Sequence, residues 1–508
     1  MREKTMLKDK PKLLFSSRQI AMIILPLLLQ NLLSIAIGMA DSIMVSNKGE
    51  AAFAGVSLVN SLDTVLITLF SALSTGGSVV LAQAMGRKDR DYACKAAKQM
   101  LYVTTMVAAG ITTVVLILRV PILRLLFGEV EADVWSAALA YFFFLALSLP
   151  FLAMENSVAA TLRAQGDSMT SLKISILMNL VNIVGNAILI YGLDLGAAGA
   201  AIATLFSRMM GAFIKLIIIR NPKRYIHIAK LFHYRPNGSM IKAILRIGIP
   251  NGIEQSMYNF GNLINSSLVS SLGTISIAAN AASNSICNIQ YSAGGACQNS
   301  MVAVVGRCVG AKEKKQAKQY TWLLIGIAYL IVLAVAVPSS IFATPLLRFY
   351  GLSGETSEVA RQLLIFQSII SILLWPIAFC LPSALRAAGD VKSTMIISVF
   401  SMWVFRVALA HVIAQDTVSL FGILSFPGLG MGVMGVRIAV SIDWLFRAIC
   451  FCARVISGKW LTKYREIPTK KAGISGPHGQ LPHPPTVLQE QKENRKSPVR
   501  MEDFREYP

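Results

Sequence analysis

Charge of either sign is scarce in this chain. Only 15% of its 508 residues are charged, whereas 54% are hydrophobic and the mean hydropathy is +0.59. Typical soluble domains carry about 25% charged residues. A water-soluble enzyme of this length would have too little polar surface, and a disordered chain would be far less apolar. The composition therefore excludes both classes.

Acids are scarcer than bases. The chain has 26 Asp and Glu against 48 Lys and Arg, so its net charge is +22. In a soluble protein this balance indicates a nucleic-acid partner. In a membrane protein it indicates basic loops beside anionic lipid on the cytoplasmic side. We therefore expect contact with membrane lipid and no nucleic-acid partner.

Cysteine and histidine are also few, and neither is clustered. The seven cysteines are odd in number, and none has metal-site spacing with the five histidines, which excludes a secreted disulfide framework. The chain lacks G-x-x-x-x-G-K-[ST], H-E-x-x-H and G-x-S-x-G. We therefore expect no enzymatic activity, no ATP-driven export by this chain and no cofactor.

Long apolar runs dominate what is present. A membrane helix needs about 20 predominantly apolar residues. Twelve runs of that kind fall at 18–45, 54–85, 99–120, 134–162, 169–191, 196–219, 243–272, 276–308, 320–344, 357–385, 392–415 and 431–457. The first follows a basic segment and has no signal-peptidase site, so we interpret it as an uncleaved span. These runs predict an all-α integral membrane protein with twelve transmembrane helices.

The loops between the spans alternate in charge. Basic loops lie at 86–98, 220–246 and 307–318, whereas the opposite loops, such as 129–133 and 355–358, are acidic. The positive-inside rule places the basic loops in the cytoplasm, together with both termini if the span number is even. We predict a cytoplasmic N-terminus (1–17), a first lobe (18–219), a cytoplasmic linker (220–242), a second lobe (243–457) and a disordered cytoplasmic tail (458–508).

The two halves of the chain repeat one another. LRAQGD at 162–167 recurs as LRAAGD at 385–390, Pro26 recurs as Pro250, and Gly86 recurs as Gly310. GAAGAAIAT at 196–204 recurs as GVMGVRIAV at 432–440, after an insertion at 416–428. Six spans per half give both halves the same orientation, so we expect a pseudo-twofold axis along the membrane normal, as in parallel-repeat transporters.

These motifs resemble a known family. MADSIMVS at 39–46 resembles the V-D-T-x-x-V-G signature of the multidrug and toxic compound extrusion (MATE) family. LRAQGD and LRAAGD resemble its loops after helices four and ten, and GIPNGIEQ at 248–255 resembles the start of its seventh helix. The chain is most similar to the NorM-type branch.

The resemblance implies an antiporter of the cell inner (plasma) membrane. Such proteins export small organic, cationic or amphipathic compounds by alternating access between two lobes, driven by Na⁺ or H⁺. We expect a monomer. The alternative is a flippase for lipid-linked saccharides, which shares the two-lobed fold.

Asp41 is the first candidate site residue. It lies within an apolar run, where a charged side chain costs at least about 2.5–3.5 kcal/mol at mid-helix. Such a residue usually faces the protein interior and binds an ion, takes a proton or pairs. The alternative is a hydrated carboxylate near the outer interface. We expect Asp41 to bind or carry the coupling cation.

Two asparagines are expected beside it. Asn182 and Asn186 are four residues apart and share one helix face. Amide oxygens and one carboxylate suit a hard cation such as Na⁺. The alternative is that the asparagines make hydrogen bonds between helices. The resemblance adds Thr204, which falls on a family threonine, and we also expect Asn156 to face this lobe.

The second lobe offers weaker candidates. Glu254 is a possible second coupling carboxylate, one turn before the family position, where Tyr258 stands. Asn265, the repeat mate of Asp41, is neutral, which favours the first lobe for coupling. Tyr258 and Trp375 are candidates to line the substrate cleft.

Three further acids have structural interpretations. We expect Asp443 to pair with Arg447 four residues later. We expect Asp167 and Asp390 to pair with loop arginines or to cap the helices that follow them.

Overall fold

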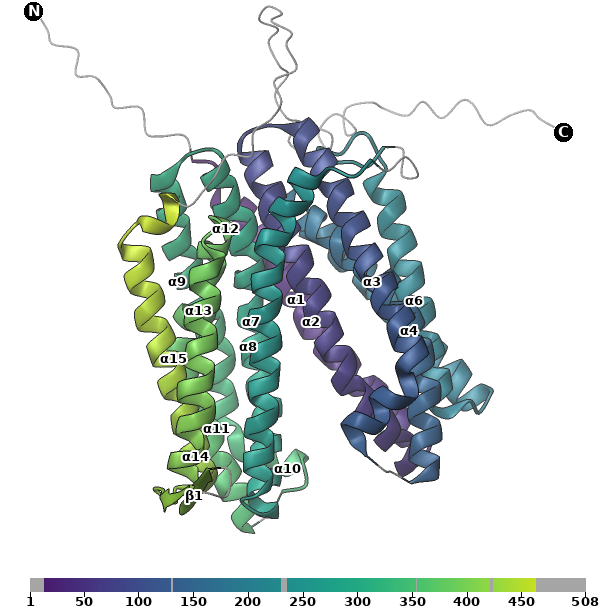
Figure 1. Ribbon diagram of the computed structural model, residues 1–508, viewed down its shortest axis with the longest axis vertical. Coiled ribbons are helices and arrows are strands. Elements are labelled where there is room, and N and C mark those ends of the chain that lie inside the picture. Colours follow the sequence, from purple (N-terminus) through teal and green to yellow (C-terminus); the bar gives the residue numbers. More distant parts are fainter. Residues whose placement is uncertain (1–12, 129–130, 230–234, 353, 421–423, 463–508) are drawn as a thin grey trace, which may run out of the picture. The chain divides into compact units, whose positions relative to one another are not determined.

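The first half of the chain forms six membrane-crossing helices. The computed structural model describes residues 13–128, 131–229, 235–352, 354–420 and 424–462. The helices are α1 (Ser17–Ser46), α2 (Glu50–Gly86), α3 (Arg90–Phe127), α4 (Ala132–Ala164), α5 (Ser168–Asn186), which continues into the π-helical turn η1 (Ala187–Gly192), and α6 (Gly196–Ile219). Each predicted span of this half falls on one of them (Figure 1).

The second half also crosses six times, with more interruptions. Its helices are α7 (Gly238–Ser270), α8 (Thr274–Gly310), α9 (Lys314–Ile341) with the short α10 (Ala343–Phe349), α11 (Gly354–Trp375) with η2 (Pro376–Cys380) and α12 (Leu381–Ala387), α13 (Val391–Ser401) with η3 (Met402–Ala408) and α14 (Leu409–Ala414), and α15 (Gly432–Ile456), followed by the 3₁₀ turn η4 (Lys459–Thr462). The twelve-helix, two-lobed fold is confirmed.

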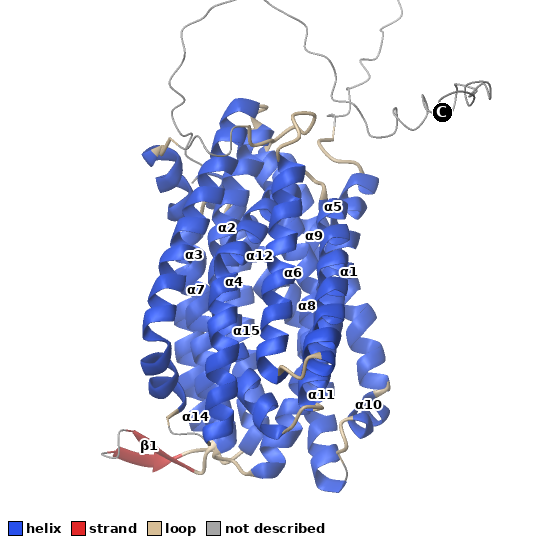
Figure 2. Cartoon of the chain, turned by 90° about the vertical axis from the view of Figure 1, so that its right-hand side faces the viewer, coloured by secondary structure: helices blue, strands red, loops and turns tan. Residues whose placement is uncertain are grey.

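One departure from an all-helical chain lies at the predicted insertion. Strands β1 (Thr417–Leu420) and β2 (Leu424–Pro427) pair antiparallel, with Thr417 opposite Pro427. This hairpin projects beside α14 (Figure 2). It accounts for the larger repeat offset before α15.

Three of the twelve crossings are less apolar than the rest. Among the described residues, nine helices are long and apolar enough to cross a membrane by composition alone, and α7, α8 and α15 are not among them. Arginines and an aspartate of α15 are buried inside the protein, as are asparagine, glutamate and glutamine residues of α7 and α8. These side chains face protein, which is where membrane proteins keep polar groups.

Residues near the predicted domain boundaries are partly described. The segment between α6 and α7 lies where we expect the linker 220–242, although 230–234 fall outside the described residues. Most of the predicted N-terminus (1–12) and of the predicted tail (463–508) also fall outside them. The proposed domain boundaries therefore stay predictions.

The two repeat acids after α4 and α12 behave differently. Asp167 caps α5 by accepting from the Thr170 backbone, and it pairs with Arg224 at 2.6 Å. Burial alone would raise the pKa of Asp167, but hydrogen bonds from Arg224 and Thr170 outweigh it and hold the pKa below its usual value. Asp390 pairs with Arg454 of α15 at 2.7 Å and makes no side-chain cap.

The halves meet where repeat mates contact each other. A Cβ atom on Gly86 would lie 2.1 Å from the Arg307 carbonyl oxygen, and one on Gly310 would lie 2.0 Å from the Gln83 carbonyl oxygen. Gln83 and Arg307 also occupy equivalent positions in the two repeats. Only glycine permits such a close approach of α2 to α8.

Two hydrogen bonds repeat the same symmetry. Gln83 Nε2 donates to the carbonyl oxygen of Ala387 at 2.8 Å, and Arg307 Nε donates to that of Ala164 at 3.1 Å. The two acceptors are the alanines of LRAAGD and LRAQGD. Mates that exchange contacts must lie close to the axis that relates them. The pseudo-twofold axis therefore passes between α2 and α8 at the end of the protein that carries these loops.

Candidate functional site

Four predicted residues from three helices lie together in the first half. Asp41 lies in the last two turns of α1 and is half-buried. Its Oδ1 accepts a hydrogen bond from Nδ2 of Asn186, the last residue of α5, at 2.7 Å. Asn182 lies one turn earlier on α5, and its Nδ2 donates to Thr204 Oγ1 of α6 at 3.3 Å. The structure thus brings Asp41, Asn182, Asn186 and Thr204 into one cluster.

The orientation of the Asn182 amide bears on the chemistry. Thr204 donates its hydroxyl hydrogen to the Ala200 carbonyl oxygen at 2.9 Å, so it accepts from Asn182. With the amide turned, Nδ2 of Asn182 donates to Oδ1 and Oδ2 of Asp41 at 2.9 and 3.1 Å. The Thr204 hydroxyl can then donate its hydrogen to Oδ1 of Asn182 instead of to Ala200, so the turned amide is the one whose oxygen and nitrogen both have partners.

One buried acceptor of the cluster has no partner among the described residues. Oδ1 of Asn186 is buried and has no hydrogen-bond partner, and Asn186 as a whole is only 1% exposed. Buried unpaired acceptors are costly unless a proton or a cation satisfies them. The Asp41 carboxylate and the amide oxygens of Asn182 and Asn186, once these side chains rotate, are hard donors of the kind that bind Na⁺, and a proton on Asp41 is the alternative occupant.

Two predicted residues lie elsewhere. Asn156 lies on α4, and its buried Nδ2 has no hydrogen-bond partner. Glu254 lies on α7 in the second half, where it accepts from Ser398 at 2.8 Å and from Arg386 at 3.5 Å. No described hydrogen bond joins either residue to the Asp41 cluster.

Sequence reasoning missed two buried ion pairs in the first half. Asp63 of α2 pairs with Arg208 of α6 at 2.7 Å, and Glu155 of α4 pairs with Lys215 of α6. Each of these charges stands in an apolar run, which was the available signal. Among the described residues, the acids placed well inside first-half spans are Asp41, Asp63 and Glu155. Of these three, only Asp41 lacks an ion pair. The structure thus singles out Asp41.

The second half contains a buried cluster whose charge is opposite to that of the Asp41 cluster. Asp443 of α15 is 0% exposed and pairs with Arg406 at 2.7 Å and with Arg447 at 2.8 Å. The Asp443–Arg447 pair predicted from spacing is confirmed. The guanidinium of Arg406 lies 4.9 Å from the ring centre of Tyr258. Two cations share one acid, so the cluster carries a net positive charge.

Aromatic rings pack beside this cluster. Trp375 is 4% exposed and stacks with Phe379 at 5.6 Å and with Tyr291 at 6.1 Å. Tyr258 meets Phe379 edge-on at 6.1 Å. These contacts place Tyr258 and Trp375 within the packed second half.

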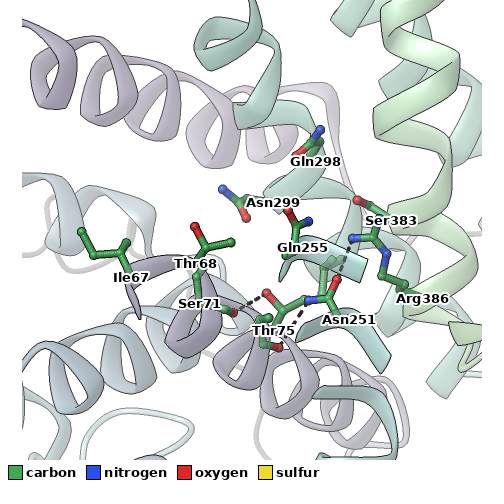
Figure 3. Close-up of a pocket in the computed structure, with 12 residues that line it drawn as sticks. Ile67, Thr68, Ser71, Thr75, Asn251, Gln255, Gln298, Asn299, Ser383 and Arg386 are labelled. Atoms are coloured by element: carbon green, nitrogen blue, oxygen red, sulfur yellow. Dashed lines mark hydrogen bonds between the residues drawn. The ribbon is translucent and has the colours of Figure 1, made fainter. Parts of the chain in front are cut away.

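A cavity of about 230 Å³ lies between the halves (Figure 3). It is lined by Ile67, Thr68, Ser71, Ala72 and Thr75 of α2, Asn251 and Gln255 of α7, Gln298, Asn299 and Val302 of α8, and Ser383 and Arg386 of α12. Tyr258 and Trp375 are not among the lining residues. Side chains of both lobes therefore line this cavity.

Both halves of the chain match a known protein family. A family model described as MatE matches residues 26–188 and, again, 250–412. Both ends of the second match are shifted by 224 residues, which is the spacing of the repeat mates Pro26 and Pro250. The internal repeat is therefore confirmed at the level of the family model.

Relatives of known name cover nearly the whole membrane part. The chain is 28% identical to the uncharacterized transporter YisQ of Bacillus subtilis, over 86% of this chain and 94% of that protein. It is 26% identical to a probable multidrug resistance protein NorM of Thermotoga maritima, over 87% and 93%.

A solved structure shares the fold. It is described as the outward-facing conformation of a multidrug resistance MATE family transporter, and it matches with a TM-score of 0.78 at 22% identity, over 88% of this chain and 96% of that one. Since the family model matches more than half of the sequence, the chain belongs to the MatE family of multidrug efflux transporters.

Proposed function

We propose that the protein is a cation-coupled antiporter that exports organic compounds by alternating access of the space between its lobes. One observation carries this proposal. Asp41 accepts from Asn186 and, with its amide turned, from Asn182. Oδ1 of Asn186 is buried without a hydrogen-bond partner among the described residues, and Asp41 has no ion pair among them. Such a set is built to gain and lose a cation rather than to hold helices together.

Cation binding has a direct structural consequence there. Na⁺ at Asp41 attracts the amide oxygens of Asn182 and Asn186 in place of their N–H groups, and H⁺ on Asp41 removes its charge, so either cation changes how α1 packs against α5. Since these helices belong to the first lobe, the cation favours one arrangement of that lobe over another. Only such a difference in affinity lets a ligand shift a conformational equilibrium.

The transport cycle follows from reciprocity. The organic compound enters the inward-open space between the lobes, and the lobes rock outward. The cation then reaches Asp41 from outside and lowers the affinity for the compound. Compound binding must weaken cation binding by the same factor. Na⁺ and H⁺ both satisfy the cluster, and the amide oxygens favour Na⁺.

We further propose that the protein lies in the plasma membrane with both termini in the cytoplasm. The loops around Arg90, Arg224 and Arg307 support this orientation, because the cytoplasmic side of a membrane protein is enriched in Lys and Arg.

Proteoliposomes test the coupling. Fluorescent dyes, one cationic and one zwitterionic, are loaded, and their efflux is followed under an imposed Na⁺ gradient or pH gradient. Wild-type protein should respond to one gradient, and Asp41→Asn should abolish the response. Asp133→Asn, at the exposed first turn of α4, is the matched control and should behave as wild type.

Two outcomes contradict the proposal. Efflux that is driven equally well in Asp41→Asn would remove Asp41 from the coupling. If neither gradient moves either dye, a lipid-linked saccharide becomes the cargo to test, in a fluorescent-lipid flipping assay with the same liposomes.

A further inference from the structure

The cavity between the lobes has an unusual lining for a multidrug transporter. Eight of its twelve lining residues are neutral and polar, three are aliphatic, and one, Arg386, is charged. Within the described part of the chain, no aromatic and no acidic side chain lines it. Lipophilic cations are held by aromatic faces and carboxylates, and drug-sized ligands by apolar walls. None of these features lines this cavity, so its chemistry suits a different group.

Arg386 determines which ligand charge the cavity prefers. It is 8% exposed, and its Nη1 donates to Asn251 Oδ1 at 3.1 Å. Its Nε has no hydrogen-bond acceptor. Figure 3 shows the guanidinium directed toward Asn251 and Ser383 at one wall of the cavity. A buried guanidinium with unused donors is suited to a planar anionic group.

The ion pair between Arg386 and Glu254 leaves donors of the guanidinium available to a ligand. Glu254 lies 3.5 Å from Arg386 Nη2, longer than a good charge-assisted hydrogen bond. Glu254 is itself held by Ser398 at 2.8 Å and does not line the cavity. The ion pair is therefore loose enough for a second acceptor to compete for the guanidinium.

The rest of the lining complements a polar ligand. The amides of Gln255, Gln298 and Asn299 and the hydroxyl of Ser383 offer both donors and acceptors, and Thr68, which donates to the Thr64 carbonyl oxygen at 2.7 Å, offers an acceptor. One guanidinium balances a single negative charge rather than the −1.5 to −2 of a phosphate monoester. The volume, about 230 Å³, is below the range of about 300–1,000 Å³ for drug sites. It therefore suits one polar part of a compound.

We propose that this cavity binds the carboxylate of a polar organic substrate, with Arg386 as the residue that determines specificity. The inference deepens the proposed transport function and rests on it, because it names the chemical class of the exported compound. A zwitterion has the carboxylate that this cavity would bind and also the positively charged group that the family resemblance implies.

Binding to the detergent-solubilised full chain tests the proposal without any gradient. Three probes of similar size are titrated by calorimetry: hippurate, its neutral analogue N-benzoylglycinamide, and the cation benzoylcholine. Hippurate should bind about tenfold tighter or more than either, the range of a charge-assisted hydrogen bond. Arg386→Gln should remove that preference, and Glu254→Gln should tighten hippurate binding severalfold by removing the competing acid.

Further variants keep the test decisive. If Arg386→Gln fails to fold because Glu254 is left unpaired, the double variant Glu254→Gln/Arg386→Gln takes its place. Arg437→Gln is the matched control, since Arg437 is a buried arginine of the same lobe that does not line the cavity. It should bind hippurate within twofold of wild type.

The refuting results are specific. A wild-type preference for hippurate below threefold, or a preference that survives both Arg386 variants, overturns the proposal. Carboxylate binding without gradient-driven efflux would refute the antiporter proposal alone. Gradient-driven efflux of the cationic dye without carboxylate binding would refute this inference alone.

Discussion

Asp443→Asn should be among the most destabilising single substitutions in the second lobe. The carboxylate accepts from Arg406 Nε at 2.9 Å and from Arg447 Nε at 2.8 Å, and Ser401 donates to it as well. The substitution keeps the side-chain shape and a hydrogen-bond acceptor for Ser401. What it removes is the one negative charge that two buried guanidinium groups share.

The magnitude follows from burial. Asp443 is 0% exposed and both arginines are 3% exposed, so water cannot replace the lost charge. Removing one partner of a buried ion pair costs about 3–5 kcal/mol. In a unit of the size of one lobe, each kcal/mol lowers Tm by about 2–4 °C. We therefore expect Tm to fall on the order of 10 °C.

Thermal unfolding in detergent measures this effect. Asp443→Asn/Arg447→Gln should recover part of the loss, because one of the two uncompensated charges is gone. Asp416→Asn, on an exposed loop residue, is the matched control and should leave Tm within about 1 °C. A fall of less than about 3 °C in Asp443→Asn, or a double variant less stable than the single one, would refute the reasoning.

Three other substitutions probe separate parts of the structure. Gly310→Val should block the close approach of α2 to α8, since even a Cβ would lie 2.0 Å from a backbone oxygen; efflux should fall below a tenth of wild type, and unimpaired efflux would contradict this. Thr204→Val should remove the hydroxyl that bonds the Asn182 amide, loosen that amide beside Asp41 and weaken Na⁺ or H⁺ coupling about tenfold, seen as a shift in the half-saturating cation concentration; an unchanged value would argue against it. Asp167→Asn should lower stability by about 0.5–1 kcal/mol at pH 7. Because the pKa of Asp167 is lowered in the folded state, that difference should shrink as the pH falls below about 4, and a difference that grows in acid would refute the assignment.

The number and positions of the long helices were the most predictable part of the structure. Span length and apolar composition are local properties, so twelve runs located twelve crossings. The repeat was also predictable, because motifs such as LRAQGD and LRAAGD keep both their order and their spacing. The hairpin β1–β2 was not, because the insertion at 416–428 shows no sheet signal beyond a few alternating residues.

The site was predictable only in part. Asn182 and Asn186 share a face because of helix periodicity, and the family resemblance pointed to Asp41 and Thr204. The pairs Asp63–Arg208 and Glu254–Arg386 join residues 145 and 132 positions apart. No periodicity relates such residues, and only the packing of whole helices decides which charges meet. Trp375 illustrates the same limit, since its stacking partner Tyr291 comes from a different helix.

Because Gly86 and Gly310 are in contact, a small rotation at this end of α2 would give a large displacement at its other end. Two backbones that touch without intervening side chains can roll on each other, since no interlocked rotamers must separate. The axis lies near one end of α2, which has 37 residues and is therefore about 55 Å long. By the same geometry, a roll of about 10° at this fulcrum displaces the opposite end of the helix by about 10 Å. If the lobes rock as proposed, a small change that the cation causes at Asp41 is enlarged along α2 into a large displacement at its far end.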